Sequence, residues 1–187
     1  MANDAPDTRL RGQGSGLPPD STCVPNWTGN RLTVEGDPSY LRAFVGAVRG
    51  PSGKDGEEPE VLDFEQHVPT PPELLADHHV PRGQLPDWYT WRREHWGTKW
   101  NVMGSTREGE PEDGSVTYQF STAWAPPDAW LFRVSSAHPQ LTFQHEYVEE
   151  MAQFAGRGIV LAGELTYHEQ LDPYSVEWVQ WEEPEDE

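Results

Sequence analysis

The sequence has little cysteine and little positive charge. Cys23 is its only cysteine, which excludes an intramolecular disulfide and any metal site built from several cysteines. The 13 Lys and Arg residues stand against 32 Asp and Glu residues, for a formal net charge of −19. Because phosphate neutralisation needs a basic face, this balance argues against direct binding to nucleic acid or to anionic membranes. A protein partner with a basic surface is the natural complement; the alternative is that the charge serves solubility alone.

Long apolar runs are absent as well. No segment approaches the roughly 18 consecutive apolar residues of a membrane-spanning helix. The first residues contain no apolar stretch of the kind found in signal peptides. We therefore expect no membrane partner and a cytoplasmic location.

The sequence also lacks the usual signatures of catalysis. It contains no Gly-x-Ser-x-Gly nucleophile elbow, no phosphate-binding loop and no His-Glu-x-x-His motif. His78 and His79 are adjacent, and adjacent residues rarely fit one metal site. We therefore predict no catalytic residue, no metal ligand and no cofactor. Enzymatic activity stays an open question, with the balance against it.

Aromatic residues are plentiful by contrast, and four of the nine tryptophans fall in residues 86–102. Pro86 suits the first position of a helix, and Gly97 suits the left-handed position that ends one. A helix this aromatic is expected to pack against a sheet, with Trp88 and Trp91 in the core. The alternative for such tryptophans is a stacking platform for bases or a surface for a protein partner.

Alternation and helical spacing divide the rest of the chain into strands and helices. The predicted strands cover residues 30–36, 61–68, 98–102, 115–124, 141–147, 159–161, 163–168 and 176–181. The predicted helices cover residues 40–48, 73–75 and 129–136, with Ser39 as an N-cap and residues 156–158 as a turn. Several connections between strands are too short for parallel crossovers. The expected fold class is therefore α+β, an enlarged ferredoxin-like sandwich with a mainly antiparallel sheet and helices on one face.

Composition also suggests the domain limits. Residues 1–25 are rich in Gly, Pro, Asp and Ser and are expected to form a flexible N-terminal arm. Residues 26–181 are expected to form a single ferredoxin-like domain. Residues 182–187 are almost all acidic and are expected to be a disordered tail.

Several ordered, tryptophan-rich segments carry a family resemblance; they are residues 26–27, 30–36, 87–91, 95–101, 120–127 and 154–158. Together they resemble the YubB-like family of small proteins carried by bacteriophages and conjugative plasmids, over about residues 26–165. The resemblance implies a ferredoxin-like domain and a place in the host cytoplasm, and it implies no reaction. Thr28 stands where the family usually has Cys, so we expect no cysteine-dependent role at that position.

The candidate binding residues are cations and tryptophans in or beside those segments: Arg31, Arg92, His95, Lys99, Trp100, Trp124 and Arg157. If the cations converge, they form a small positive pocket for a carboxylate or a phosphate. The alternative is that they form ion pairs with Asp87, Glu94 or Glu35.

Three functions follow from these features. The first is an accessory protein of a phage or mobile element that binds a host or phage protein, as a counter-defence inhibitor or a modulator of a nucleic-acid-handling protein. Its acidic runs, residues 55–65, 108–113, 146–150 and 182–187, would then meet a basic surface; the alternative is that they are solvated loops. The second is a small-ligand-binding or enzymatic domain that uses the positive pocket. The third, disfavoured by charge, is a single-stranded nucleic-acid binder that uses the sheet face.

Overall fold

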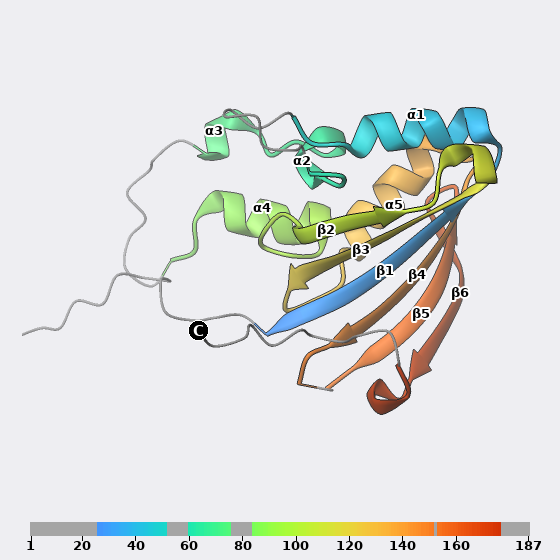
Figure 1. Cartoon of the computed structure of the whole chain (residues 1–187). Helices are drawn as coiled ribbons and strands as arrows, with labels where there is room; N and C mark the ends of the chain where they lie inside the picture. The colour runs from blue at the N-terminus through green and yellow to red at the C-terminus, as the bar shows by residue number, and fades with distance from the viewer. Residues whose placement is uncertain (1–25, 52–59, 76–83, 152, 177–187) are drawn as a thin grey trace, which may run out of the picture.

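The computed structural model describes residues 26–51, 60–75, 84–151 and 153–176 (Figure 1). The predicted arm, residues 1–25, and the predicted tail, residues 182–187, lie outside these residues. Residues 177–181 of the predicted last strand also lie outside them, and Val176 is not in a strand.

Six strands form one antiparallel sheet in the order β2-β3-β1-β4-β5-β6. The strands are β1 (Trp27–Glu35), β2 (Met103–Glu108), β3 (Ser115–Ala123), β4 (Thr142–Glu149), β5 (Ala155–Leu161) and β6 (Glu164–Leu171). The helices are α1 (Pro38–Val48), α2 (Phe64–His67), α3 (Pro72–Leu75), α4 (Asp87–Trp96) and α5 (Asp128–Ala137), with short 3-10 turns η1 (Pro111–Asp113) and η2 (Pro173–Ser175).

The connectivity is that of the ferredoxin-like fold. Strand β1 leads through helices to β2, the hairpin partner of β3, and β3 leads through α5 to β4. The resulting order β2-β3-β1-β4 places β1 between β3 and β4, as in a split βαβ arrangement. The hairpin β5-β6 then extends the sheet beyond β4. The predicted enlarged ferredoxin-like fold of the α+β class is confirmed.

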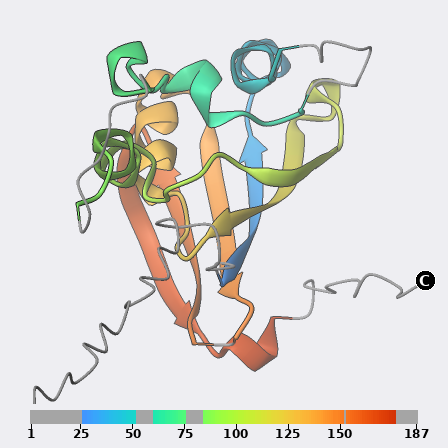
Figure 2. The ribbon, with the colours of Figure 1, turned by 90° about the vertical axis from the view of Figure 1, so that its left-hand side faces the viewer.

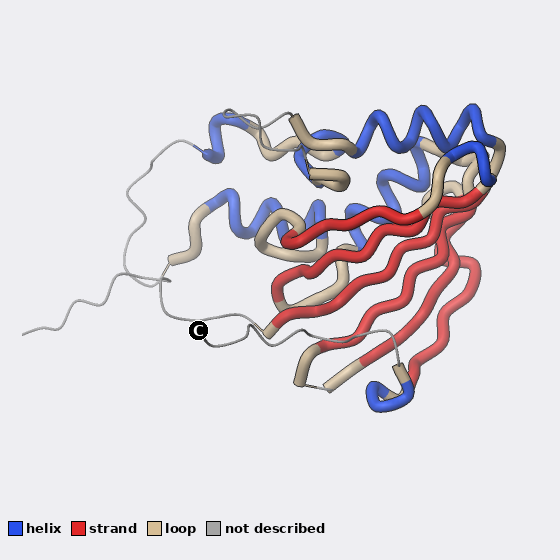
Figure 3. Tube along the Cα trace, in the orientation of Figure 1, coloured by secondary structure: helices blue, strands red, loops and turns tan. Residues whose placement is uncertain are grey.

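Helices α1, α4 and α5 lie over one face of the sheet, and the other face carries no described α-helix (Figures 1, 2 and 3). The strands alternate accordingly. On β1, Leu32 and Val34 are buried on the helix side, while Arg31 and Thr33 lie half-exposed on the opposite side, which we call the open face. The core between the layers is strongly aromatic, and Phe44 contacts rings of both the sheet and the loops.

Two predicted strands are wrong, and the two segments involved contact each other. Within residues 61–68 the chain forms helix α2, because the Asp63 side chain accepts a hydrogen bond from the Glu65 backbone N–H at 2.9 Å and caps the helix. Residues 98–102 form a loop before β2. Its Asn101 side chain accepts from the Phe64 backbone N–H at 2.9 Å, which ties the loop to α2.

The predicted turn at residues 156–158 is also wrong, because this segment lies inside β5. The glycines serve close packing on the helix side: a Cβ on Gly156 would lie 2.5 Å from the hydroxyl oxygen of Tyr147, and one on Gly158 would lie 3.1 Å from Leu165 Cδ1. The turn comes later, at Ala162 and Gly163, between β5 and β6.

The remaining local predictions largely hold. The helix predicted for residues 40–48 is α1, but its N-cap is Asp37, whose side chain accepts from the Ser39 backbone N–H, and not Ser39 itself. The aromatic helix is α4, and it ends as predicted at Gly97, with φ at 89°. Its tryptophans are less buried than predicted, since Trp88 and Trp91 are half-buried and Trp96 is the fully buried one.

Candidate binding site on the open face of the sheet

The seven candidate residues fall into three separate groups, and of the cations expected to converge only Arg31 and Arg157 line one hollow. Arg92 and His95 lie on α4, in the helix layer. Lys99, Trp100 and Trp124 lie together beside the end of β3. Arg31 and Arg157 lie on the open face of the sheet, where both line the same hollow.

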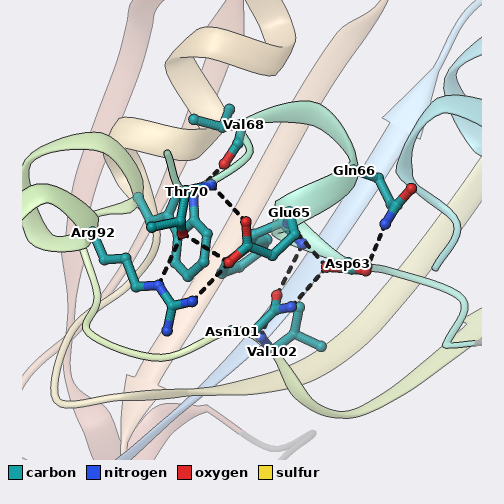
Figure 4. A network of polar contacts seen from close by, with 10 residues as sticks. Asp63, Glu65, Gln66, Val68, Thr70, Arg92, Asn101 and Val102 are labelled. Atoms are coloured by element: carbon teal, nitrogen blue, oxygen red, sulfur yellow. Dashed lines mark hydrogen bonds and ion pairs between the residues drawn. The ribbon is translucent and has the colours of Figure 1, made fainter. Parts of the chain in front are cut away.

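Arg92 is the centre of a closed polar network (Figure 4). Its Nη2 donates to Glu65 Oε1 at 2.7 Å, and its Nε donates to Thr70 Oγ1 at 3.0 Å. Glu65 in turn accepts from the Thr70 backbone N–H at 2.6 Å. The guanidinium also lies over the ring of Trp96, 4.6 Å from its centroid. Arg92 is therefore a structural tie between α2 and α4, and its ionic partner is Glu65.

His95 is likewise used inside the helix layer. Its ring stacks on Trp91 with centroids 4.1 Å apart and planes 11° apart. Its Nδ1 lies 2.8 Å from the Trp91 carbonyl oxygen, which can only accept, so Nδ1 carries the proton and donates. Both its ring face and one nitrogen are engaged with Trp91, and His95 does not line the hollow.

Lys99 lies between two tryptophan rings, with Nζ 4.0 Å from the Trp100 centroid and 3.8 Å from the Trp124 centroid. The side chain is buried, and among the described residues its Nζ has no hydrogen-bond partner. Trp124 is 40% exposed and has a left-handed φ of 69°, which is uncommon for a bulky residue. The aromatic rings thus take the place of anionic partners for this ammonium group.

The hollow on the open face has a volume of about 420 Å³. Arg31 lies on β1 and Arg157 on β5, and the β4 strand runs between them. The lining residues are Arg31, Thr33, Gln144, His145, Glu146, Arg157, Gly158, Ile159 and Tyr167. Most of these side chains end in polar groups, so the hollow suits a polar ligand.

A row of charged side chains crosses the hollow from strand to strand. The register places Arg31 opposite Glu146, Glu146 opposite Arg157, and Arg157 opposite Glu169. Arg157 is satisfied within this row, because its Nη2 lies 2.7 Å from Glu169 Oε2 and its Nε donates to the same oxygen at 2.8 Å. Tyr167 also donates to this oxygen, at 2.6 Å.

Arg31 differs from Arg157 in having no such partner. Its Nε is buried and has no hydrogen-bond acceptor among the residues that the structure describes. Within the same residues it forms no ion pair, although Glu146 is its cross-strand neighbour. A buried donor without an acceptor is costly, so this guanidinium is the group of the hollow best placed to bind an anion.

Sequence reasoning missed His145, which lies on β4 with its ring in the core. Its Nε2 donates to Asn30 Oδ1 at 3.0 Å, because the Asn30 amide nitrogen already donates to Thr28 O and Thr122 Oγ1. Burial lowers the pKa of His145 to about 4, so the ring is neutral at neutral pH. The sequence did contain a signal for this buried polar group, because Asn30 and Thr122 are polar residues at positions that face the core.

The acidic runs are partly used inside the protein. Asp63 caps α2 and accepts from Asn101 Nδ2 at 2.6 Å, and Glu65 holds Arg92. Glu149 is buried, and its Oε2 accepts from the backbone N–H groups of Met151 and Gln153 at 2.9 and 3.2 Å. These carboxylates are therefore not free to meet a basic partner.

Two negative findings concern the described part of the chain. None of its helices has the length and apolar character needed to cross a membrane. No group of three or more His, Cys, Asp and Glu side chains within it is arranged to hold a metal ion.

Comparison with known proteins supports the fold. Residues 96–186 match a family model described as the ferredoxin-like domain in Api92-like protein. The crystal structure of protein api92 from Yersinia pseudotuberculosis is similar in fold, with a TM-score of 0.60 over 79% of this chain and 98% of that one, at 9% sequence identity. No curated protein matches the sequence. By sequence over residues 96–186, and by fold over most of its length, this chain is thus similar to Api92-like proteins.

Proposed function

We propose that this protein is a binding protein that takes an anionic group, a carboxylate or a phosphate, in the hollow on the open face of its sheet. The observation that carries the proposal is the buried Nε of Arg31, which has no acceptor among the described residues. A guanidinium presents paired donors that match the oxygen atoms of both anions. This observation favours the hypothesis of a ligand pocket over that of an acidic docking surface. The pocket contains two of the expected cations, Arg31 and Arg157.

Glu146 limits what the hollow accepts. Its carboxylate is the cross-strand neighbour of both Arg31 and Arg157, so it repels an anion that offers only acceptors. An anion with a donor beside it satisfies both charges at once, because the donor bonds to Glu146 while the anion bonds to Arg31. The preferred ligand class is therefore a monoprotonated phosphate or a carboxylate with a neighbouring ammonium group, as in an amino acid.

The test is a titration followed by backbone-amide NMR, with inorganic phosphate and with glycine as probes. We expect shifts concentrated on β1, β4 and β5, and their loss in Arg31→Gln. Arg133→Gln is the matched control, since Arg133 is an exposed arginine on α5 and its loss changes the net charge equally. Shifts that persist in Arg31→Gln, or that disappear equally in Arg133→Gln, would refute the site.

A protein partner with a basic surface is the second candidate, and the excess of 32 acids over 13 bases favours it. An accessory role in a phage or mobile element, with a counter-defence target in the host, belongs to this candidate. Affinity purification at two salt concentrations tests it: we expect a single basic partner that dissociates as salt rises. Recovery of the protein without a partner at low salt would remove this candidate and leave the hollow unaffected.

A further inference from the structure

A second cavity lies on the other side of the sheet, between α5 and strands β4 to β6. Its volume is about 150 Å³. The lining residues are Asp128, Leu131, Phe132, His145, Tyr147, Gly158, Val160, Leu165 and His168. We call it the α5 cleft. It shares no cation with the hollow, since neither Arg31 nor Arg157 lines it.

The α5 cleft has a polar mouth and an apolar floor. Asp128 and His168 are exposed, whereas Leu131 and Val160 are buried. Near the mouth, the Tyr147 hydroxyl lies 3.2 Å from His168 Nε2. A ligand with one polar end and a short apolar body would match this division, with the polar end at Asp128.

Two glycines of β5 shape this side of the sheet, and Gly158 lines the cleft. Gly156 lets the Tyr147 ring lie against the strand, since a Cβ there would be 2.5 Å from the hydroxyl oxygen. Gly158 leaves the floor open, since a Cβ there would be 3.1 Å from Leu165 Cδ1. The segment Gly156–Arg157–Gly158 thereby serves both faces, because Arg157 lines the hollow while the glycines lie on the helix side, where Gly158 lines the cleft.

Asp128 is the acidic residue that lines the cleft. Its carboxylate has no ion pair and accepts no side-chain hydrogen bond within the described part of the chain. Although the residue is exposed at the mouth, the protein around its carboxylate displaces water and raises the pKa of Asp128, and the electrostatic interaction with His168 offsets part of that rise. Burial and the nearby charge of Asp128 also raise the pKa of Tyr147, which keeps its hydroxyl neutral and able to accept a hydrogen bond.

We propose that the α5 cleft binds a small organic cation, an ammonium group on a short apolar chain. The ammonium would bond to the Asp128 carboxylate and to the Tyr147 hydroxyl oxygen, while the chain would pack against Leu131 and Val160. An apolar cavity of ~150 Å³ accommodates a molecule of the size of benzene, so a chain of about four carbon atoms fits. The site is independent of the anion site proposed for the open face.

The test uses n-butylammonium, n-butanol and butyrate as probes, titrated into the full chain at neutral pH and followed by methyl NMR of Leu131, Val160 and Leu165. We expect n-butylammonium to bind at least about tenfold more tightly than n-butanol, and butyrate not to bind, because only the first gains from the carboxylate. In Asp128→Asn this preference should disappear. In Glu164→Gln, which removes an equal charge from the exposed start of β6, it should remain.

Equal affinity for n-butylammonium and n-butanol would overturn the proposal, because the cleft would then be a merely apolar pocket. An unchanged preference in Asp128→Asn would overturn it as well. The comparison of the three probes needs only the unmodified protein, so it decides the question even if Asp128→Asn fails to fold.

Discussion

The Arg92 network and the Arg31 hollow are two half-buried arginine sites of opposite character. Arg92 is only 17% exposed in its side chain, and it has a carboxylate, a hydroxyl and an aromatic ring as partners. Arg31 has a buried Nε without an acceptor among the described residues. Charge and burial are similar in the two cases, so the number of partners is what separates a structural arginine from one that is available to a ligand.

The two arginines differ in their number of partners because different parts of the fold position the neighbouring side chains. Glu65 reaches Arg92 because α2 and the segment to Thr70 fold back over α4, where short local contacts fix both groups. On the sheet, the positions of side chains follow from strand register. The register gives Arg31 the neighbours Gln119 and Glu146, and it gives Arg157 the neighbour Glu169, which pairs with it. Within the described residues, Arg31 is therefore the cation of this row that has no ion pair.

The largest expected effect concerns His145, whose ring is buried in the core on the helix side of β4. Its pKa of about 4 in the folded protein is below the ordinary 6.5, so the unfolded chain binds the proton first as pH falls. Stability should therefore be full above pH 6.5 and be lost progressively down to about pH 4. At 1.36 kcal/mol per pKa unit, the loss is on the order of 3 kcal/mol.

Urea unfolding across this pH range measures the effect. His145→Gln is the control, because glutamine keeps an N–H donor for Asn30 and does not titrate. His67 and His138 also have pKa values lowered by burial, so the relevant quantity is the difference in slope between the two proteins. Identical slopes would contradict the prediction, because they would mean that folding does not lower the pKa of His145.

The next effect compares the two arginines directly. In Arg92→Met the Glu65 carboxylate, 27% exposed, loses its charged partner, and we expect a loss of about 2 kcal/mol in the free energy of unfolding. Arg31→Met removes no pair and should stay within about 0.5 kcal/mol of the parent protein. Urea unfolding of both variants, with the exposed Arg93→Met as control, gives the comparison. A larger loss at Arg31 than at Arg92 would reverse the assignment of structural and available arginines.

Much of the fold could be predicted from the sequence, because alternation on β1, β3 and β4 is a local signal. The errors fall where a distant residue decides the local structure. Asp63 begins α2 with the help of Asn101, which is 38 positions away. The two glycines of β5 resemble a turn in the sequence, and only the ring of Tyr147 on β4 explains why a strand needs them.

The site was predictable in part for the same reason. Arg31 and Arg157 were found as cations in characteristic segments, but that they share a face depends on cross-strand register, which the sequence does not display. The sequence offered Asp87, Glu94 and Glu35 as the alternative ion-pair partners of the cations, and all three lie in predicted elements. The actual partner, Glu65, lies 27 positions before Arg92, in a helix that the pattern presented as a strand.

The smallest expected effect concerns Arg157, and it tests whether pairing decides availability within the hollow itself. Arg157 is exposed and bound to Glu169, so Arg157→Gln should leave urea unfolding unchanged and should weaken phosphate binding less than Arg31→Gln does. Glu169→Gln should change the affinity for phosphate in the opposite direction. It removes the carboxylate that pairs with Arg157, so phosphate should bind more tightly in the same NMR titration. If Arg157→Gln weakened binding as much as Arg31→Gln, and Glu169→Gln changed nothing, a paired arginine would be as available as an unpaired one. The number of hydrogen-bond and ionic partners would then not explain why one arginine is structural and the other is available to a ligand.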